Sequence, residues 1–203
     1  MTRSALIYDI EIYSAIPERN GSRVPNIKYC DGWDDHKNMG VSVIGVYDCQ
    51  YEEARVFCQD NWSEFVKLAE SREVLVGFNN IPFDNVVLRT VGIHLDDAKC
   101  YDLLREMWLA AGLGEKYAYP SHAGYGLDAT CKANFGRGKT GNGALAPVLW
   151  QQGKIGTVID YCLSDVARTR FLLELVNLDC SLIDPKTGKQ LAMRLPLAKK
   201  VAA

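Results

Sequence analysis

Apolar and polar positions follow two kinds of spacing along this chain. Strand-like apolar runs cover residues 6–13, 41–47, 54–57, 74–78 and 99–103. Helical spacing covers residues 62–69, 83–90, 104–111 and 127–134, and a long final helix is expected from about residue 155. Three strands come first, and strands then alternate with helices. This order predicts an α/β domain whose mixed sheet has antiparallel N-terminal strands, then parallel strands, and flanking helices.

The expected domain spans residues 1–180. Residues 14–40 interrupt it, because they are rich in Pro, Gly, Asn and charged residues and predict a long loop insertion, a kind of segment that is often functional. Residues 181–203 are expected to form a basic C-terminal tail. A basic tail suits contact with a polyanion, and a solvated terminus explains the same composition equally well.

Asp9 and Glu11 are the most informative polar residues. They interrupt the first apolar run two positions apart, so in a strand both side chains project from one face while Leu6, Tyr8 and Ile10 share the other. Burying two carboxylates is unfavourable unless a cation pairs with them, and a divalent metal ion is a suitable partner. The alternative is a strand face exposed to solvent.

The final helix carries a second polar pair. Its expected core stripe consists of Ile155, Ile159, Cys162, Val166 and Leu173. Tyr161 and Asp165 are four residues apart and form another stripe, at the edge where a helix overlooks a cleft. There the Asp can bind metal and the Tyr can position or deprotonate a water molecule. An ordinary amphipathic boundary is the alternative.

Asp84 follows a predicted strand at a turn into a helix. In α/β sheets this end of the strands is where sites are built. A helix cap is the alternative role for an Asp at this position.

Composition limits the classes of protein. With 48% hydrophobic and 24% charged residues and a net charge of −2, the chain is an ordinary globular protein and carries no overall nucleic-acid-binding charge. The absence of a long apolar run or a signal peptide argues against a membrane protein. Seven scattered cysteines without a C-x-x-C pair favour a reducing, intracellular (cytoplasmic) location. The three isolated histidines argue against a zinc site.

Three motifs occur in order: D-x-E at residues 9–11, N-x-x-x-F-D at residues 79–84 and Y-x-x-x-D at residues 161–165. In this order they resemble the DEDD superfamily of 3′–5′ exonucleases, which have a ribonuclease H-like fold. The chain looks most similar to the tyrosine branch, which includes the proofreading domains of family B DNA polymerases, because the histidine branch would need His where this chain has Asp160.

The resemblance implies a two-metal hydrolysis of phosphodiester bonds from a 3′ end. The catalytic residues it implies are Asp9, Glu11, Asp84, Tyr161 and Asp165. Asp9, Glu11 and Asp165 would hold one Mg²⁺ or Mn²⁺ ion, and Asp9 would also reach a second ion near Asp84. Asn79 and Phe83 would contact the substrate, Phe83 by stacking on a terminal base; a core role for Phe83 is equally compatible.

The segment Gly136–Gly143 contains Gly-Lys-Thr but lacks a P-loop, since Ala133 stands where the Walker pattern needs Gly. Arg137 and Lys139 are expected to contact substrate phosphates from this loop, with a plain solvated loop as the alternative. Trp33, Trp62, Trp108 and Trp150 lie far apart in the sequence, and most of them are expected in the core rather than as platforms for base stacking.

Two departures from the family pattern narrow the role. Pro82 occupies a position where family B domains often have Asn, and this departure affects how the terminal nucleotide would be bound. No polymerase domain follows, which predicts a free-standing nuclease or a subunit acting in trans with a replication or repair partner. The expected substrate is single-stranded nucleic acid or a 3′ end, with DNA favoured over RNA. The rival hypotheses are an exoribonuclease of the same fold and a catalytically silent nucleic-acid-binding module.

Overall fold

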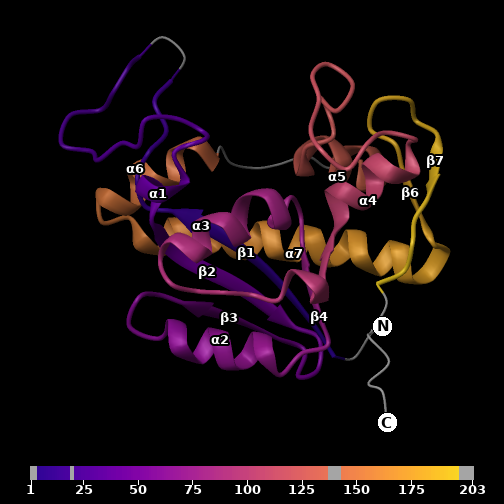
Figure 1. The fold of residues 1–203 in the computed structure, drawn as a ribbon, viewed down its shortest axis with the longest axis horizontal. Helices are drawn as coiled ribbons and strands as arrows, with labels where there is room; N and C mark the ends of the chain where they lie inside the picture. Colours follow the sequence, from indigo (N-terminus) through magenta and orange to yellow (C-terminus); the bar gives the residue numbers. More distant parts are fainter. Residues whose placement is uncertain (1–3, 19–20, 137–142, 197–203) are drawn as a thin grey trace.

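A mixed five-stranded sheet forms the centre of the molecule (Figure 1). The computed structural model describes residues 4–18, 21–136 and 143–196. The strands are β1 (Ala5–Ile12), β2 (Val41–Asp48), β3 (Glu53–Phe57), β4 (Val74–Gly77) and β5 (Cys100–Asp102). Their order in the sheet is β3-β2-β1-β4-β5; β1 to β3 pair antiparallel, and β4 and β5 join β1 in parallel.

Helices cover both faces of this sheet. They are α1 (His36–Met39), α2 (Trp62–Glu70), α3 (Asn85–Thr90), α4 (Leu103–Ala110), α5 (Leu127–Phe135), α6 (Ala146–Gln151) and α7 (Ile155–Asp179), with a π-helical turn η1 (Asn80–Asp84) and 3₁₀ turns η2 (Asp97–Lys99) and η3 (Gly143–Leu145). The predicted fold class is confirmed: this is a mixed α/β domain with the arrangement of a ribonuclease H-like fold. None of the described helices combines the length and the apolar character that crossing a bilayer requires.

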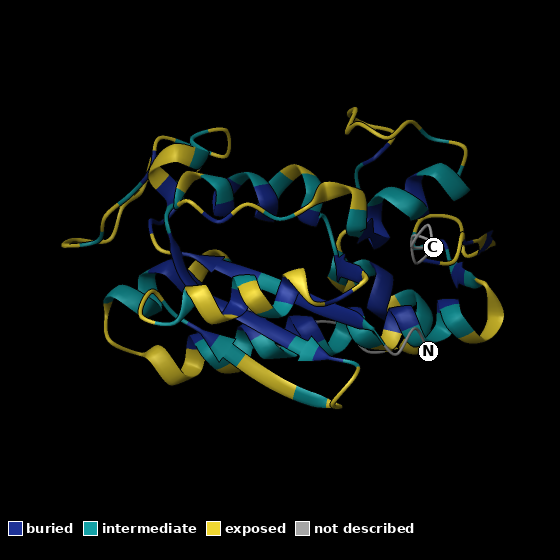
Figure 2. Ribbon diagram, turned by 60° about the horizontal axis from the view of Figure 1, so that its bottom comes forward, coloured by how far each residue is buried: buried dark blue, intermediate teal, exposed yellow. Residues whose placement is uncertain are grey.

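β1 is buried on both faces, as its apolar sequence predicts (Figure 2). On one face Leu6, Tyr8 and Ile10 pack in a core shared with α2 and α3. On the other face Ala5 and Ile7 belong to a core shared with α4, α5 and α7. Asp9 and Glu11 continue this second face along the strand, so both carboxylates face the side of the sheet that α7 covers.

The core stripe of α7 differs at its start from the predicted one. Cys162, Val166 and Leu173 are buried as expected, but Ile155 is 36% exposed. Ile155 is the first residue of α7, and Val158 instead begins the buried stripe by packing on Val43 of β2 and on α6. The prediction for Ile155 was wrong because the start of the helix extends beyond the edge of the layer it covers.

The basic segment after residue 180 begins with an ordered hairpin. Its strands are β6 (Ser181–Ile183) and β7 (Gln190–Ala192). Leu182, Leu191 and Met193 are buried in the core on the α7 side of the sheet. The division at residue 180 stays a prediction, and Lys199 and Lys200 lie outside the described residues.

A buried ion pair joins β2 to the start of β4. Arg72 donates from Nε and Nη2 to the two carboxylate oxygens of Asp48, at 2.9 and 2.6 Å, and the side chains are only 6% and 0% exposed. Burial opposes ionisation of Asp48, but hydrogen bonds from Arg72 and from the Gln50 N–H, together with the charge of Arg72, hold its pKa below the ordinary value.

We expect Asp48→Asn to lower the free energy of unfolding by about 3–5 kcal/mol, because it leaves the buried guanidinium unpaired. Glu53→Gln is the control: it breaks an exposed pair with Arg55 and should cost less than about 1 kcal/mol. Urea unfolding at neutral pH measures both. Because folding lowers the pKa of Asp48, its contribution should be present above the ordinary carboxyl pKa and be lost as the pH falls through the lowered one. Equal losses in the two variants would contradict the assignment.

Candidate functional site

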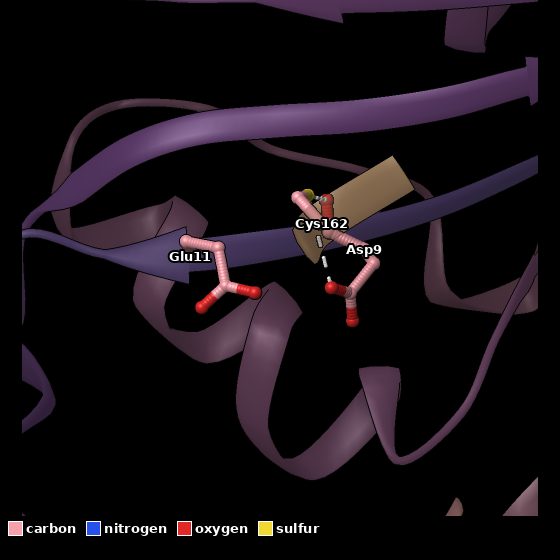
Figure 3. Close-up of side chains that lie close together, drawn as sticks. All are labelled: Asp9, Glu11 and Cys162. Atoms are coloured by element: carbon pink, nitrogen blue, oxygen red, sulfur yellow. Dashed lines mark hydrogen bonds between the residues drawn. The ribbon is translucent and has the colours of Figure 1, made fainter. Parts of the chain in front are cut away.

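Asp9, Glu11 and Cys162 form a cluster that could hold a metal ion (Figure 3). One potential ligand atom from each residue lies within 4.8 Å of the others. The two carboxylates project from β1 to the same side, and Cys162 approaches from α7 (Figure 3). Glu11 is only 8% exposed, so this cluster concentrates negative charge where water is largely excluded.

Asp84 joins the same stretch of β1 through the backbone. Its Oδ1 accepts a hydrogen bond of 3.2 Å from the N–H of Ile10, which lies between Asp9 and Glu11 in the sequence. Asp84 makes no capping hydrogen bond to α3, so the alternative role as a helix cap is not what the structure shows. Burial raises the pKa of the Asp84 carboxyl to about 7, and the hydrogen bond from Ile10 offsets this only in part.

The π-helical turn η1 places Asp84 there. Asn79 precedes the turn in a left-handed conformation (φ 68°), which Asn tolerates better than most residues. The carboxylate of Asp102 accepts from the N–H groups of Asn79 (2.9 Å) and Ile81 (3.2 Å), and Asn80 donates to the Tyr8 hydroxyl (2.8 Å). The turn is thereby fixed to both β5 and β1.

Tyr161 and Asp165 lie on α7 and face the same cleft as Asp9 and Glu11. This cleft has a volume of about 380 Å³. Asp165 is 7% exposed, and Arg168 donates from Nη1 to its Oδ1 at 2.8 Å. The position of Tyr161 and Asp165 agrees with the predicted cleft-facing stripe rather than with an amphipathic boundary.

Cys162 contacts Asp9 as a neutral thiol. Its Sγ lies 3.5 Å from the Asp9 carbonyl oxygen and 3.8 Å from Oδ2. Burial and the nearby charges of Asp9 and Glu11 raise the pKa of this thiol well above its ordinary value. The carboxylate oxygens of Asp9 and Glu11 are hard ligands, which suit Mg²⁺ and Mn²⁺.

A glycine allows α7 to come this close to the sheet. Gly45 of β2 pairs with Asp9 of β1, and a Cβ at Gly45 would lie 2.8 Å from the Sγ of Cys162 and 3.4 Å from Val166 Cγ2. Any larger residue therefore pushes α7 away from β1, and the side chains of Tyr161 and Asp165 with it.

The structure brings together most of the predicted site residues. The cleft is lined by Asp9, Glu11, Phe83, Tyr161 and Asp165, and Asp84 is hydrogen-bonded to the backbone beside them. Asn79 does not line the cleft; its backbone N–H instead binds Asp102. Arg137 and Lys139 lie outside the described residues.

Sequence reasoning missed two features of the cleft. Trp33, which the sequence did not single out among the four tryptophans, is 67% exposed and lines the cleft, with its ring 6.2 Å from that of Phe83. Asp102 has no motif of its own, yet its carboxylate holds η1. The concentration of Gly, Pro and acidic residues around Trp33 was the one signal that this tryptophan is not a core residue.

Comparison with known proteins gives little to identify the chain. No protein-family model and no curated protein matches it. Among solved structures, it is similar to the family B DNA polymerase from the hyperthermophilic archaeon Pyrobaculum calidifontis, with a TM-score of 0.47 and 15% identity. The similar region covers 85% of this chain and 24% of the polymerase chain, so the chain spans about a quarter of that protein. At these values the similarity assigns neither a family nor an activity.

We expect Asp9→Asn to weaken Mn²⁺ binding by at least the roughly 10- to 100-fold that loss of an outer-shell partner costs, because a carboxylate oxygen is removed from the cluster. Asp60→Asn changes the same functional group at an exposed position and should leave the affinity unchanged. Titration of Mn²⁺ by electron paramagnetic resonance measures both, and an unchanged affinity in Asp9→Asn would rule out the cluster as a cation site.

Gly45→Ala should lower the free energy of unfolding by about 1–3 kcal/mol through overpacking, and should also weaken Mn²⁺ binding because α7 shifts relative to β1. Gly156→Ala is the matched control on α7. Its Cβ would meet open space, so this change should be neutral or slightly stabilising. If Gly45→Ala preserves both properties, the close approach of α7 is not needed for the site.

Proposed function

We propose that this chain is a divalent-metal-dependent 3′–5′ exonuclease that hydrolyses phosphodiester bonds at the 3′ end of single-stranded DNA. The observation that carries the proposal is the convergence of carboxylates from three distant segments. Asp9 and Glu11 from β1 and Asp165 from α7 line one cleft, and Asp84 from η1 binds the backbone of Ile10 between the first two. The resemblance of the three motifs to the tyrosine branch of DEDD exonucleases supports the same assignment.

The residues fit a pair of hard cations. Asp9, Glu11 and Asp165 would hold one Mg²⁺ or Mn²⁺ ion, and Asp84 with Asp9 would hold the second. The buried Asp84 carboxyl, whose pKa is about 7, is the group that a neighbouring cation would most readily ionise. When bound, two such ions supply stabilisation of the charge on the attacking and leaving oxygens.

Tyr161 and Phe83 are the other cleft residues to which the proposal gives a role. The Tyr161 hydroxyl would orient the attacking water toward the phosphorus through a hydrogen bond, which prepares the water for loss of its proton. Phe83 at the cleft wall contacts the terminal base. Asn79, which does not line the cleft, contributes to the position of η1 rather than to a substrate contact.

The decisive experiment offers 5′-labelled single-stranded DNA, duplex DNA and RNA with Mg²⁺ or Mn²⁺. We expect stepwise shortening from the 3′ end, fastest on single-stranded DNA, and no shortening in excess EDTA. Asp9→Ala should lower the rate by roughly 10³-fold or more, because it removes a ligand of both ions. Tyr161→Phe should lower it by about 10²-fold while the protein remains folded.

Asp60→Asn serves as the unaffected control. Full activity in Asp9→Ala would overturn the site assignment. A preference for RNA would favour the exoribonuclease hypothesis, and binding of oligonucleotides without cleavage would favour a silent binding module.

A further inference from the structure

Trp33 has an unusual position for a tryptophan. Its side chain is 67% exposed, yet it lines the same cleft as Asp9 and Glu11 and lies against Phe83, with a ring distance of 6.2 Å and a tilt of 53°. His36 packs on the same phenylalanine at 5.9 Å. An aromatic side chain kept in water beside a cleft presents a large planar apolar surface to whatever enters that cleft.

The backbone that leads to Trp33 is held in place by hydrogen bonds to an earlier part of the chain. Ala15 and Tyr29 form a bridge, in which the N–H of Ala15 donates to the Lys28 carbonyl at 2.9 Å and the N–H of Cys30 donates to the Ala15 carbonyl at 3.0 Å. Cys30 is buried, which anchors this strand of the segment in the core next to α2 and α3.

A single glutamine connects this segment to α6. The Nε2 of Gln151 donates to the carbonyls of Tyr13 (2.9 Å) and Lys28 (3.1 Å), and its Oε1 accepts from the Lys28 N–H at 2.7 Å. The segment and α6 accordingly lie side by side at one end of the molecule (Figure 1). Trp33 is thus presented on a preorganised wall of the cleft.

The charges near Trp33 indicate what this wall accepts. Asp31, Asp34 and Asp35 lie within two residues of it, and Glu18 lines the cleft. The carboxylate of Glu18, which lines the cleft with Trp33, disfavours a phosphate at this wall, since like charges repel. A neutral planar group is favoured there, while a phosphodiester would lie beside Asp9, Glu11 and Asp165, which line the same cleft.

We propose that Trp33 is a specificity-determining residue that stacks on the terminal base of an unpaired 3′ end. This role rests on the proposed exonuclease activity, and the feature of the substrate that Trp33 recognises is an unpaired terminal base. A base can stack on Trp33 only when it is not paired. The wall therefore favours single-stranded ends that carry a base and disfavours both paired ends and abasic ends.

The first test measures binding without catalysis. Addition of the tetranucleotide (dT)₄ in EDTA should quench the intrinsic tryptophan fluorescence, and Trp33→Phe should abolish this quenching. Tyr119→Ala removes an aromatic side chain that is 81% exposed on another loop and should leave the quenching intact. Quenching that persists in Trp33→Phe, or no quenching in the wild-type protein, would overturn the proposal.

The second test measures hydrolysis of two oligonucleotides that differ only in the terminal base, which is present in one and abasic in the other. Trp33→Ala should raise KM for the normal end by about 5- to 150-fold, the range for loss of one base–aromatic stack, and leave kcat nearly unchanged. It should leave KM for the abasic end unchanged. Trp33→Phe should restore most of the affinity, because Phe also stacks.

Equal effects of Trp33→Ala on both oligonucleotides would contradict stacking. Trp33→Ala should also narrow the ratio of single-stranded to blunt duplex cleavage, and an unchanged ratio would contradict the selection of unpaired ends. If the wild-type protein hydrolyses neither oligonucleotide, the exonuclease activity fails, while the fluorescence test in EDTA still decides whether Trp33 stacks on a base.

Discussion

Beyond Ile7, β1 loses its parallel neighbour β4, and the hydrogen-bonding groups on that side of the strand need other partners. The N–H of Ile10 finds one in the carboxyl of Asp84. This hydrogen bond stands where a strand would otherwise continue the sheet. It brings Asp84 from η1 to the part of β1 that bears Asp9 and Glu11. The three acids therefore lie close together where β1 and β4 diverge.

Burying carboxyl groups at this point costs free energy, and backbone N–H groups that donate hydrogen bonds to them offset part of that cost. Asp84 and Asp102 are both buried, and burial raises the pKa of each. Asp102 is held by four backbone N–H groups, of which two belong to the turn around η1 and two to the start of α4. Asp84 receives one from Ile10. Asp102 thus accepts more backbone hydrogen bonds than Asp84 does. This difference agrees with a structural role for Asp102 and a binding role for Asp84.

Much of this arrangement could be predicted from the sequence, because it depends on local patterns. The alternation in β1 places Asp9 and Glu11 on one face, and the four-residue spacing places Tyr161 above Asp165 on α7. Contacts between distant segments follow no such rule. The approach of Cys162 to Asp9 depends on the missing side chain of Gly45, and the hold of Asp102 on η1 depends on where β5 ends.

The position of Trp33 also depends on contacts between distant segments, which the sequence pattern does not predict. Its neighbours in the sequence predict a loop, but only the bridge between Ala15 and Tyr29 and the contact with Phe83 determine that this loop forms a wall of the cleft. The hairpin after α7 depends on distant contacts in the same way. Leu182 and Leu191 lie among many basic residues, and the apolar surface that buries them comes from elements far away in the sequence.

The way the 14–40 segment is attached means that the aromatic wall of the cleft and the acidic centre are held by different parts of the structure. Apart from buried side chains such as those of Cys30 and Met39, backbone hydrogen bonds and the amide of Gln151 hold the segment, so its exposed positions are under few structural requirements. The acids of the cleft come from β1, η1 and α7 instead. A substitution at an exposed position of this segment, such as Trp33, therefore changes the wall of the cleft and leaves the acidic centre and the sheet beneath it as they are.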